Sequence, residues 1–287
     1  MSTLCPACQN EMTERLAPWL VYCYRCSLWA SLLGDKSTQL KPSTVIIEEN
    51  RNFGLKQLRL QNFQKVLNTL GLYMKLDSSK ACDVGSSYGW FLEAAARRGM
   101  KVIGIEPEES VALIGIKQGL DIRVGYFPNC MTDSDEFDLI TFNDSLEHLS
   151  NLGQVLESCY NLLTPSGKLL INIPTSQGFF FKLGLLLYRF GYKSPFHRLW
   201  QKDYSSPHLF YFNRENLEKC VSSYNFRLLY TQHLKTISLS GLWKRLRMDN
   251  NSSFLYALTM YILLVLFYPF SQMVASDALL QIYEKQG

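Results

Sequence analysis

The sequence predicts an α/β protein in which helices cover both faces of a Rossmann-like parallel sheet. An apolar run ends at Val84, a turn of small residues follows, and a helical pattern spans 90–98. Strand and helix patterns then alternate up to Pro174, with Gly99 and Gly119 placed where helices end. Such alternation is typical of a parallel sheet, and small residues in the first turn allow its backbone to approach a ligand.

Composition limits the function classes. The 287 residues, 47% of them hydrophobic, are enough for one α/β domain of ordinary size and a small appendage. A net charge of +4 is too small to indicate nucleic-acid binding without a localised basic patch. Residues 1–9 have neither the basic start nor the apolar core of a secretory signal. We therefore expect a cytoplasmic, reducing setting, where paired cysteines suggest metal before disulfide.

Residues 1–34 predict a zinc ribbon. Cys5 and Cys8 form one C-x-x-C pair, and Cys23 with Cys26 forms another, 14 residues further on. This spacing suits a tetrahedral structural zinc ion, whose binding supplies the folding free energy that so short a segment lacks. Four thiolates leave no open position for catalysis by the metal, and a redox dithiol is the alternative. The other cysteines are expected to be small hydrophobes: Cys82, Cys130, Cys159 and Cys220.

Residues 35–79 are expected to join the ribbon to the main domain. The polar stretch from Asp35 to Glu49 has the composition of a linker. Apolar residues then recur at helical intervals from Asn52 to Leu72, which predicts a helix. The main domain is expected over 80–287.

The turn after Val84 favours an adenosyl ligand over a dinucleotide. A dinucleotide fingerprint would place glycine at 85, 87 and 90, whereas the chain has Gly85, Ser87 and Trp90. The acidic residue followed by G-x-G-x-G that binds S-adenosylmethionine is met by Asp83, Gly85 and Gly89, with Ser87 as its departure.

The next predicted strand ends at Glu106 and Pro107, about 20 residues past the turn. A carboxylate at that place can accept hydrogen bonds from both hydroxyls of a ribose. Its alternative role is a solvated or capping acid before the helix that begins near Glu108. The turn and this acid together indicate an adenosyl group.

Over roughly 80–227 the chain resembles the class I S-adenosylmethionine-dependent methyltransferases, especially the branch that includes quinone-biosynthesis and sugar methyltransferases. Beyond the turn, the resemblance continues through the segment 137–149, with its Leu-Glu-His, and through Leu162–Pro174, which is similar to that branch's "LLKPGG" turn and fifth strand. It implies a seven-stranded sheet, completed by strands at Phe226–Leu234 and Ala278–Tyr283. Similar cysteine knuckles precede many methyltransferases of this branch.

The resemblance also implies site residues. Tyr126 and Phe127 are expected beside the adenine, with ordinary loop aromatics as the alternative, and Asn143 and Asp144 near the methionine part. The whole cofactor-binding set is Asp83, Gly85, Ser86, Ser87, Tyr88, Gly89, Glu106, Pro107, Tyr126, Phe127, Asn143 and Asp144. Candidate bases for an acceptor proton are Glu147, His148 and His208, and either histidine has a structural role as its alternative.

Two apolar runs fall outside the sheet pattern, at about 178–192 and 252–270. The second approaches the length of a membrane span and follows a basic, aromatic flank at 243–247. A span would separate the last strand from its sheet, so spanning conflicts with the fold. Either the runs contact a membrane surface and receive a lipid-linked acceptor, or they are buried against each other or a second subunit.

The predicted function is methyl transfer from S-adenosylmethionine to a small molecule, such as a sugar, glycan or quinone-like acceptor. Nucleic acid is not expected as a partner. The predicted location is cytoplasmic, with peripheral contact at the inner face of a membrane. The alternative is a catalytically silent adenosyl-binding scaffold whose ribbon serves as an interaction module.

Overall fold

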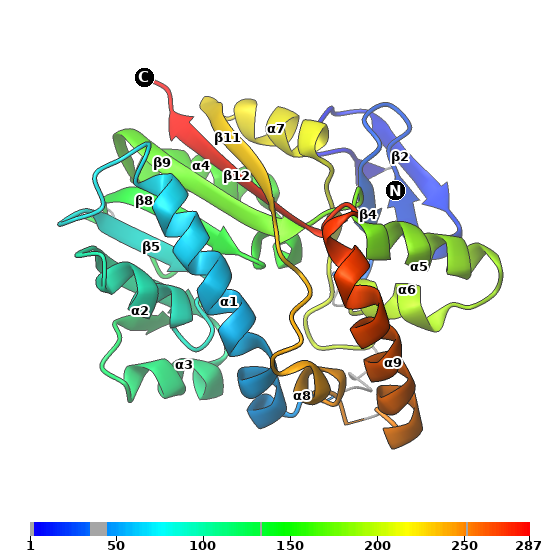
Figure 1. Ribbon diagram of the computed structural model, residues 1–287. Coiled ribbons are helices and arrows are strands. Elements are labelled where there is room, and N and C mark those ends of the chain that lie inside the picture. The colour runs from blue at the N-terminus through cyan, green and yellow to red at the C-terminus, as the bar shows by residue number, and fades with distance from the viewer. Residues whose placement is uncertain (1–2, 35–44, 133, 251) are drawn as a thin grey trace.

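The computed structural model describes residues 3–34, 45–132, 134–250 and 252–287 (Figure 1). Its centre is a seven-stranded sheet with the order β11-β12-β9-β8-β5-β6-β7. The strands are β5 (Lys80–Val84), β6 (Lys101–Glu106), β7 (Ile122–Val124), β8 (Phe137–Asn143), β9 (Leu163–Pro174), β11 (Phe226–Leu234) and β12 (Ala278–Lys285). Neighbours from β7 to β9 are parallel, and β12 is antiparallel to both β9 and β11. The predicted seven-stranded α/β fold is confirmed.

Helices cover both faces of the sheet, and the alternation of strand side chains explains why. In β8, Leu139 packs with the core on the side of α1 (Glu48–Leu70) and α2 (Trp90–Ala96). Its neighbour Ile140 packs with the core on the side of α4 (Leu152–Leu162) and α7 (Arg214–Ser222). Successive strand residues point to opposite faces, so a strand covered on both sides is largely apolar.

Two predicted boundaries differ from the structure. Helix α1 begins at Glu48, inside the predicted linker. The residue before it is fixed by a contact late in the chain, because Ile47 N–H donates to the Met248 carbonyl at 2.6 Å. The turn expected before the fifth strand lies within β9, where the register with β8 shifts between Phe137 and Leu139. Residues 35–44 of the predicted linker lie outside the described residues.

The N-terminal ribbon shares a sheet with the main domain. Its strands are β1 (Thr3–Leu4), β2 (Glu11–Arg15), β3 (Ala17–Tyr22) and β4 (Trp29–Ser31). Strand β4 pairs antiparallel with β10 (Phe210–Tyr211), a short strand late in the chain. Of the other cysteines, Cys82, Cys159 and Cys220 are buried as expected, and Cys130 is partly exposed. The ribbon is therefore fastened to the segment that carries His208.

The apolar runs form α5 (Phe179–Arg189), followed by α6 (Ser194–Leu199), and α9 (Phe254–Phe267), preceded by α8 (Leu242–Leu246). Figure 1 shows α9 on one side of the molecule, with one end beside α5 and the other beside α8. By length and composition, the segment Phe254–Ser271 could cross a membrane. Only 6% of this segment is buried inside the protein. The two runs meet where Phe267 stacks on Phe179, at 5.0 Å between ring centroids. Mutual burial, one of the expected alternatives, is seen at this junction, while most of the second run is exposed.

Candidate active site

The turn between β5 and α2 requires glycine at two positions. Gly85 has φ +77°, and a Cβ there would lie 2.5 Å from the Cβ of Ser145. Gly89 has φ +78°, and its Cβ would lie 2.2 Å from Leu120 Cδ1. Ser87, at the middle position of the glycine pattern, has φ +50°, so the serine adopts the left-handed backbone conformation that favours glycine. The departure from the glycine pattern leaves the turn intact.

The Glu106 carboxylate lies against this turn at the end of β6. Its Oε2 accepts from Ser87 N–H at 2.9 Å, and Oε1 accepts from Glu108 N–H at 3.0 Å. Burial raises the pKa of Glu106, while these two backbone donors favour its ionised form. A carboxylate offers about four acceptor positions, so each oxygen can still accept one ribose hydroxyl. Pro107 follows directly and ends the strand.

Polar atoms at the end of β8 fit the methionine part of the cofactor. Asp83 Oδ1 accepts from the Thr141 hydroxyl at 2.6 Å and from the Asn143 amide at 2.9 Å. Burial raises the pKa of Asp83 to about 6. Among the described residues, the buried Asn143 Oδ1 and Ser86 Oγ have no hydrogen-bond partner. Asp83 therefore orients Asn143, whose free oxygen can accept from a ligand amino group.

The aromatic residues expected at the cofactor site contact other protein residues in the structure, or are exposed. The Tyr88 hydroxyl donates to the Glu48 carboxylate of α1, and its ring lies 4.8 Å from that of Trp90. Phe127 is buried edge-on against Phe142 at 6.0 Å, as a core aromatic would be. Tyr126 is 68% exposed. Their contacts with adenine stay predictions.

Helix α1 reaches the site through a residue that the sequence analysis missed. Arg59 forms an ion pair with Asp144, directly after β8. Arg59 follows Leu58 within the segment whose apolar spacing predicts a helix. That spacing does not indicate which residue Arg59 pairs with. Together with Glu48, it makes α1 a wall of the site.

The three candidate bases lie together. Glu147 is fully buried in a 3₁₀ turn (Leu146–His148), and His208 Nε2 lies 3.9 Å from Glu147 Oε1. The rings of His148 and His208 are 4.8 Å apart. Among the described residues, neither Glu147 side-chain oxygen has a hydrogen-bond partner, and burial raises the pKa of Glu147 to about 8. Glu147 is therefore mostly protonated at neutral pH.

Both histidines are neutral, because burial lowers the pKa of each. His148 Nδ1 lies 2.9 Å from the Pro207 carbonyl, which fixes the proton on Nδ1 and leaves the Nε2 lone pair available. His208 has both nitrogens engaged: Nε2 with the Gln201 amide at 2.8 Å and Nδ1 with the Tyr211 hydroxyl at 3.2 Å. His148 is the better placed of the two to accept a proton.

The ribbon holds the backbone of this cluster. The Ser31 hydroxyl donates to the His208 carbonyl at 2.7 Å, and Ser31 N–H donates to the Leu209 carbonyl at 2.8 Å. Leu209 N–H donates in turn to the Glu147 carbonyl at 2.7 Å. These contacts join strand β4, His208 and Glu147, which are far apart in sequence.

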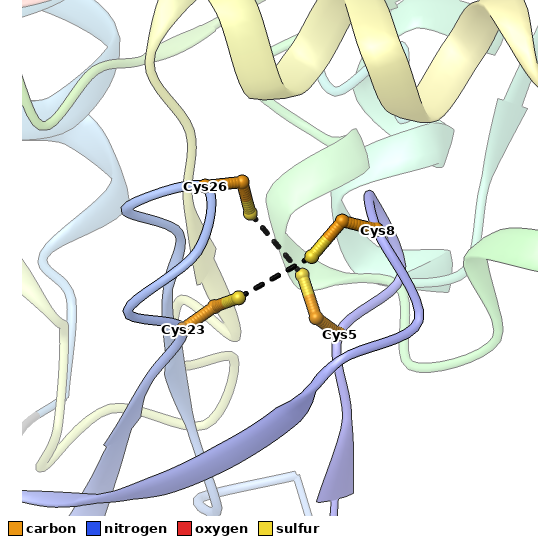
Figure 2. Close-up of side chains that lie close together, drawn as sticks. All are labelled: Cys5, Cys8, Cys23 and Cys26. Carbon is orange, nitrogen blue, oxygen red and sulfur yellow. Dashed lines mark hydrogen bonds between the residues drawn. The ribbon is translucent and has the colours of Figure 1, made fainter.

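The four ribbon cysteines converge from two loops, and Figure 2 shows their sulfur atoms facing one another. The sulfurs of Cys5 and Cys26 are 3.4 Å apart, as are those of Cys8 and Cys23, and all four lie within 4.8 Å of one another. Zinc–sulfur bonds of about 2.3 Å in a tetrahedron separate the sulfurs by roughly 3.8 Å. The cluster therefore fits one structural zinc ion.

Comparison with known proteins settles the family. The sequence profile of the family described as "Methyltransferase domain" matches residues 55–231, more than half of the chain. The chain belongs to this methyltransferase family. Its seven-stranded sheet and glycine turn agree with the class I S-adenosylmethionine-dependent branch that the sequence resembles.

Curated relatives match part of the chain at low identity. The ubiquinone biosynthesis O-methyltransferase of Glaesserella parasuis is 30% identical over 129 residues, which is 41% of this chain and 52% of that protein. The mitochondrial ubiquinone biosynthesis O-methyltransferase of Mus musculus is 29% identical over 121 residues, 39% of this chain and 33% of that protein. The matched part of the chain thus spans about half of the length of one relative and a third of the length of the other.

Solved structures share the fold. An S-adenosylmethionine-dependent methyltransferase from Mesorhizobium loti has a TM-score of 0.52 at 10% identity, covering 79% of this chain and 100% of that chain. The magnesium protoporphyrin IX methyltransferase of Synechocystis PCC 6803, solved with bound SAH, has a TM-score of 0.52 at 11% identity, covering 81% of this chain and 85% of that chain.

Proposed function

We propose that this protein transfers a methyl group from S-adenosylmethionine to a small-molecule acceptor. The observation that carries the proposal is the arrangement around the glycine turn: Glu106 lies beside Ser87, and the free oxygen of Asn143 lies at the end of β8. Glu106 would accept the ribose hydroxyls and Asn143 the amino group. The bound cofactor supplies a sulfonium-activated methyl group, and alignment with exclusion of water can account for much of the rate.

His148 is the proposed general base for a hydroxyl acceptor. Its Nε2 carries a lone pair at neutral pH, since the Pro207 carbonyl holds the other nitrogen and burial keeps the ring neutral. Glu147, mostly protonated, and His208, engaged at both nitrogens, are proposed to position His148 and the acceptor. Asp144, paired with Arg59, would border the same space.

The acceptor is proposed to be a quinone-like isoprenoid or a sugar or glycan intermediate. The names of the curated relatives support a quinone precursor with a hydroxyl group, and the apolar, mostly exposed helix α9 agrees with a lipid-like acceptor. We place the protein in the cytoplasm, peripherally at the inner face of a membrane, with a structural zinc ion in the ribbon. Nucleic acid is not proposed as a partner.

The test is a turnover assay with isotope-labelled S-adenosylmethionine and two acceptor classes, catechol-type quinone precursors and nucleotide-linked sugars. We expect label transfer to one class, and a loss of at least 100-fold in kcat for His148→Ala. His233→Ala, at an exposed histidine of β11, is the matched control. Cofactor binding without turnover on either acceptor class would instead favour the alternative, a catalytically silent adenosyl-binding scaffold.

A further inference from the structure

The outward face of α9 is apolar where a surface helix is normally polar. Leu255 is 72% exposed, Ile262 50% and Leu266 66%, and these residues recur at helical spacing along one side. Ala257, on the inward side, is buried. A helix that is apolar all round belongs in a core or against lipid. We call the exposed side chains of Leu255, Leu258, Ile262, Leu263 and Leu266 the α9 face.

The helix is tied to the domain at both ends. At its start, Trp243 of α8 packs against Phe254 and Tyr261, with ring centroids 5.6 and 5.8 Å apart. After its end, β12 enters the sheet between β9 and β11. A 14-residue helix is about 21 Å long, shorter than the roughly 30 Å hydrocarbon core. The α9 face can therefore lie along a bilayer surface and cannot cross it without dismantling the sheet.

The charges near α9 match an anionic surface. The sequence has no Asp or Glu between Asp249 and Asp277, and none between Glu157 and Asp203, the stretch that contains α5. Cations stand at both ends: Arg247 lies over the Trp243 and Phe254 rings at 5.9 Å, and Lys182 on α5 is exposed. Cations and tryptophan beside an apolar helix suit lipid head groups. A symmetric dimer through this face would bring like charges together.

We propose that the α9 face lies in the surface of an anionic lipid bilayer, with Lys182 and Arg247 at the head groups. This inference deepens the proposed function and rests on it for the lipid-like acceptor. A chain of aromatic contacts leads inward from α5: Phe181 lies 4.6 Å from Tyr211 between ring centroids, and the Tyr211 hydroxyl contacts His208. An acceptor headed by a ring and tailed by an isoprenoid would leave its tail in the bilayer.

Vesicle flotation tests the proposal with the full chain. The wild type should float with phosphatidylcholine vesicles that contain phosphatidylglycerol, more weakly with phosphatidylcholine alone, and less as salt is added. The double variant Ile262→Glu/Leu266→Glu should lose at least tenfold in lipid affinity. Leu72→Glu, a 78% exposed leucine beyond the end of α1, is the matched control and should float like the wild type.

Absence of wild-type flotation on phosphatidylglycerol vesicles at low salt would overturn the proposal. A wild-type dimer that Ile262→Glu/Leu266→Glu converts to monomer would overturn it in favour of a second copy on the α9 face. Circular dichroism checks the fold of each variant, and Leu255→Gln replaces the double variant if the latter unfolds. S-adenosylmethionine binding is measured in parallel. A protein that floats but does not bind the cofactor contradicts the proposed function and leaves this inference standing. A protein that binds the cofactor but does not float contradicts this inference and leaves the proposed function standing.

Discussion

Glu106 is the residue on which the placement of the ribose depends. Its two carboxylate oxygens each accept one backbone N–H and retain capacity for a ligand hydroxyl. Glu106→Ala should therefore weaken S-adenosylmethionine binding by at least tenfold, about 1.4 kcal/mol, while the chain stays folded. Glu108→Ala removes a neighbouring exposed carboxylate and should bind normally. A folded Glu106→Ala protein with undiminished affinity would show that the ribose lies elsewhere.

Glu147 makes a prediction about pH and stability. Its pKa is about 8 in the folded chain, against roughly 4.3 when unfolded, so the unfolded state releases this proton first as pH rises. The free energy of unfolding should fall between about pH 5 and pH 8, by on the order of 1 kcal/mol per pH unit from this group. Glu147→Gln should flatten that decline, as measured by urea unfolding.

The exposed Glu157 supplies the control for this experiment, since Glu157→Gln should leave the pH profile unchanged. Parallel profiles for wild type and Glu147→Gln would mean that the carboxyl is solvated or paired in solution.

Site residues that lie near one another in the sequence could be predicted from it. Contacts between residues that are far apart in the sequence could not. The turn at Gly85 and Gly89 and the acid at Glu106 follow from spacing, because the chemistry lies within one strand-turn-helix-strand unit. Arg59 with Asp144, and Ser31 with His208, depend on how distant segments pack. No periodicity in the sequence records such pairs.

At the scale of elements, the ribbon is expected to support catalysis through its pairing with β10. Cys5→Ser/Cys8→Ser should release one bound zinc ion, measured by metal analysis, and loosen β4. Ser31 would then hold the His208 segment less firmly, so kcat should fall several-fold while S-adenosylmethionine affinity stays within about twofold. Cys130→Ser changes a cysteine outside the cluster and is the control.

Zinc-free wild-type protein after gentle purification would contradict the ribbon assignment. Equal losses of kcat and cofactor affinity in the double variant would point to general unfolding rather than to a role of β4.

Most strands and helices could be predicted because each has its own pattern. The strand at Phe226–Leu234 lies where the sequence places it, and the last strand begins at Ala278 as expected. Strand β10 was missed, because two residues carry no period and its partner β4 lies in the ribbon. The start of α1 was missed because the contact between Ile47 and Met248 sets it.

At the scale of the whole molecule, the sequence shows that α9 is apolar but does not show what packs against it. Its composition agrees equally with a core helix and with a lipid-facing one, and the difference lies in what packs against it. The structure places α8 and Phe179 against parts of α9 and leaves Leu255 and Leu266 exposed. Helix α5 links the two regions, because its Phe179 stacks on Phe267 of α9 and its Phe181 packs against Tyr211.

The measurement that tests the central claim most directly is calorimetric titration of the purified protein with S-adenosylmethionine and, separately, with NAD. The glycine turn, Glu106 and Asn143 predict saturable binding of S-adenosylmethionine at one site per chain and no binding of NAD. Binding of NAD alone, or of neither compound by a chain that circular dichroism shows to be folded, would contradict the account.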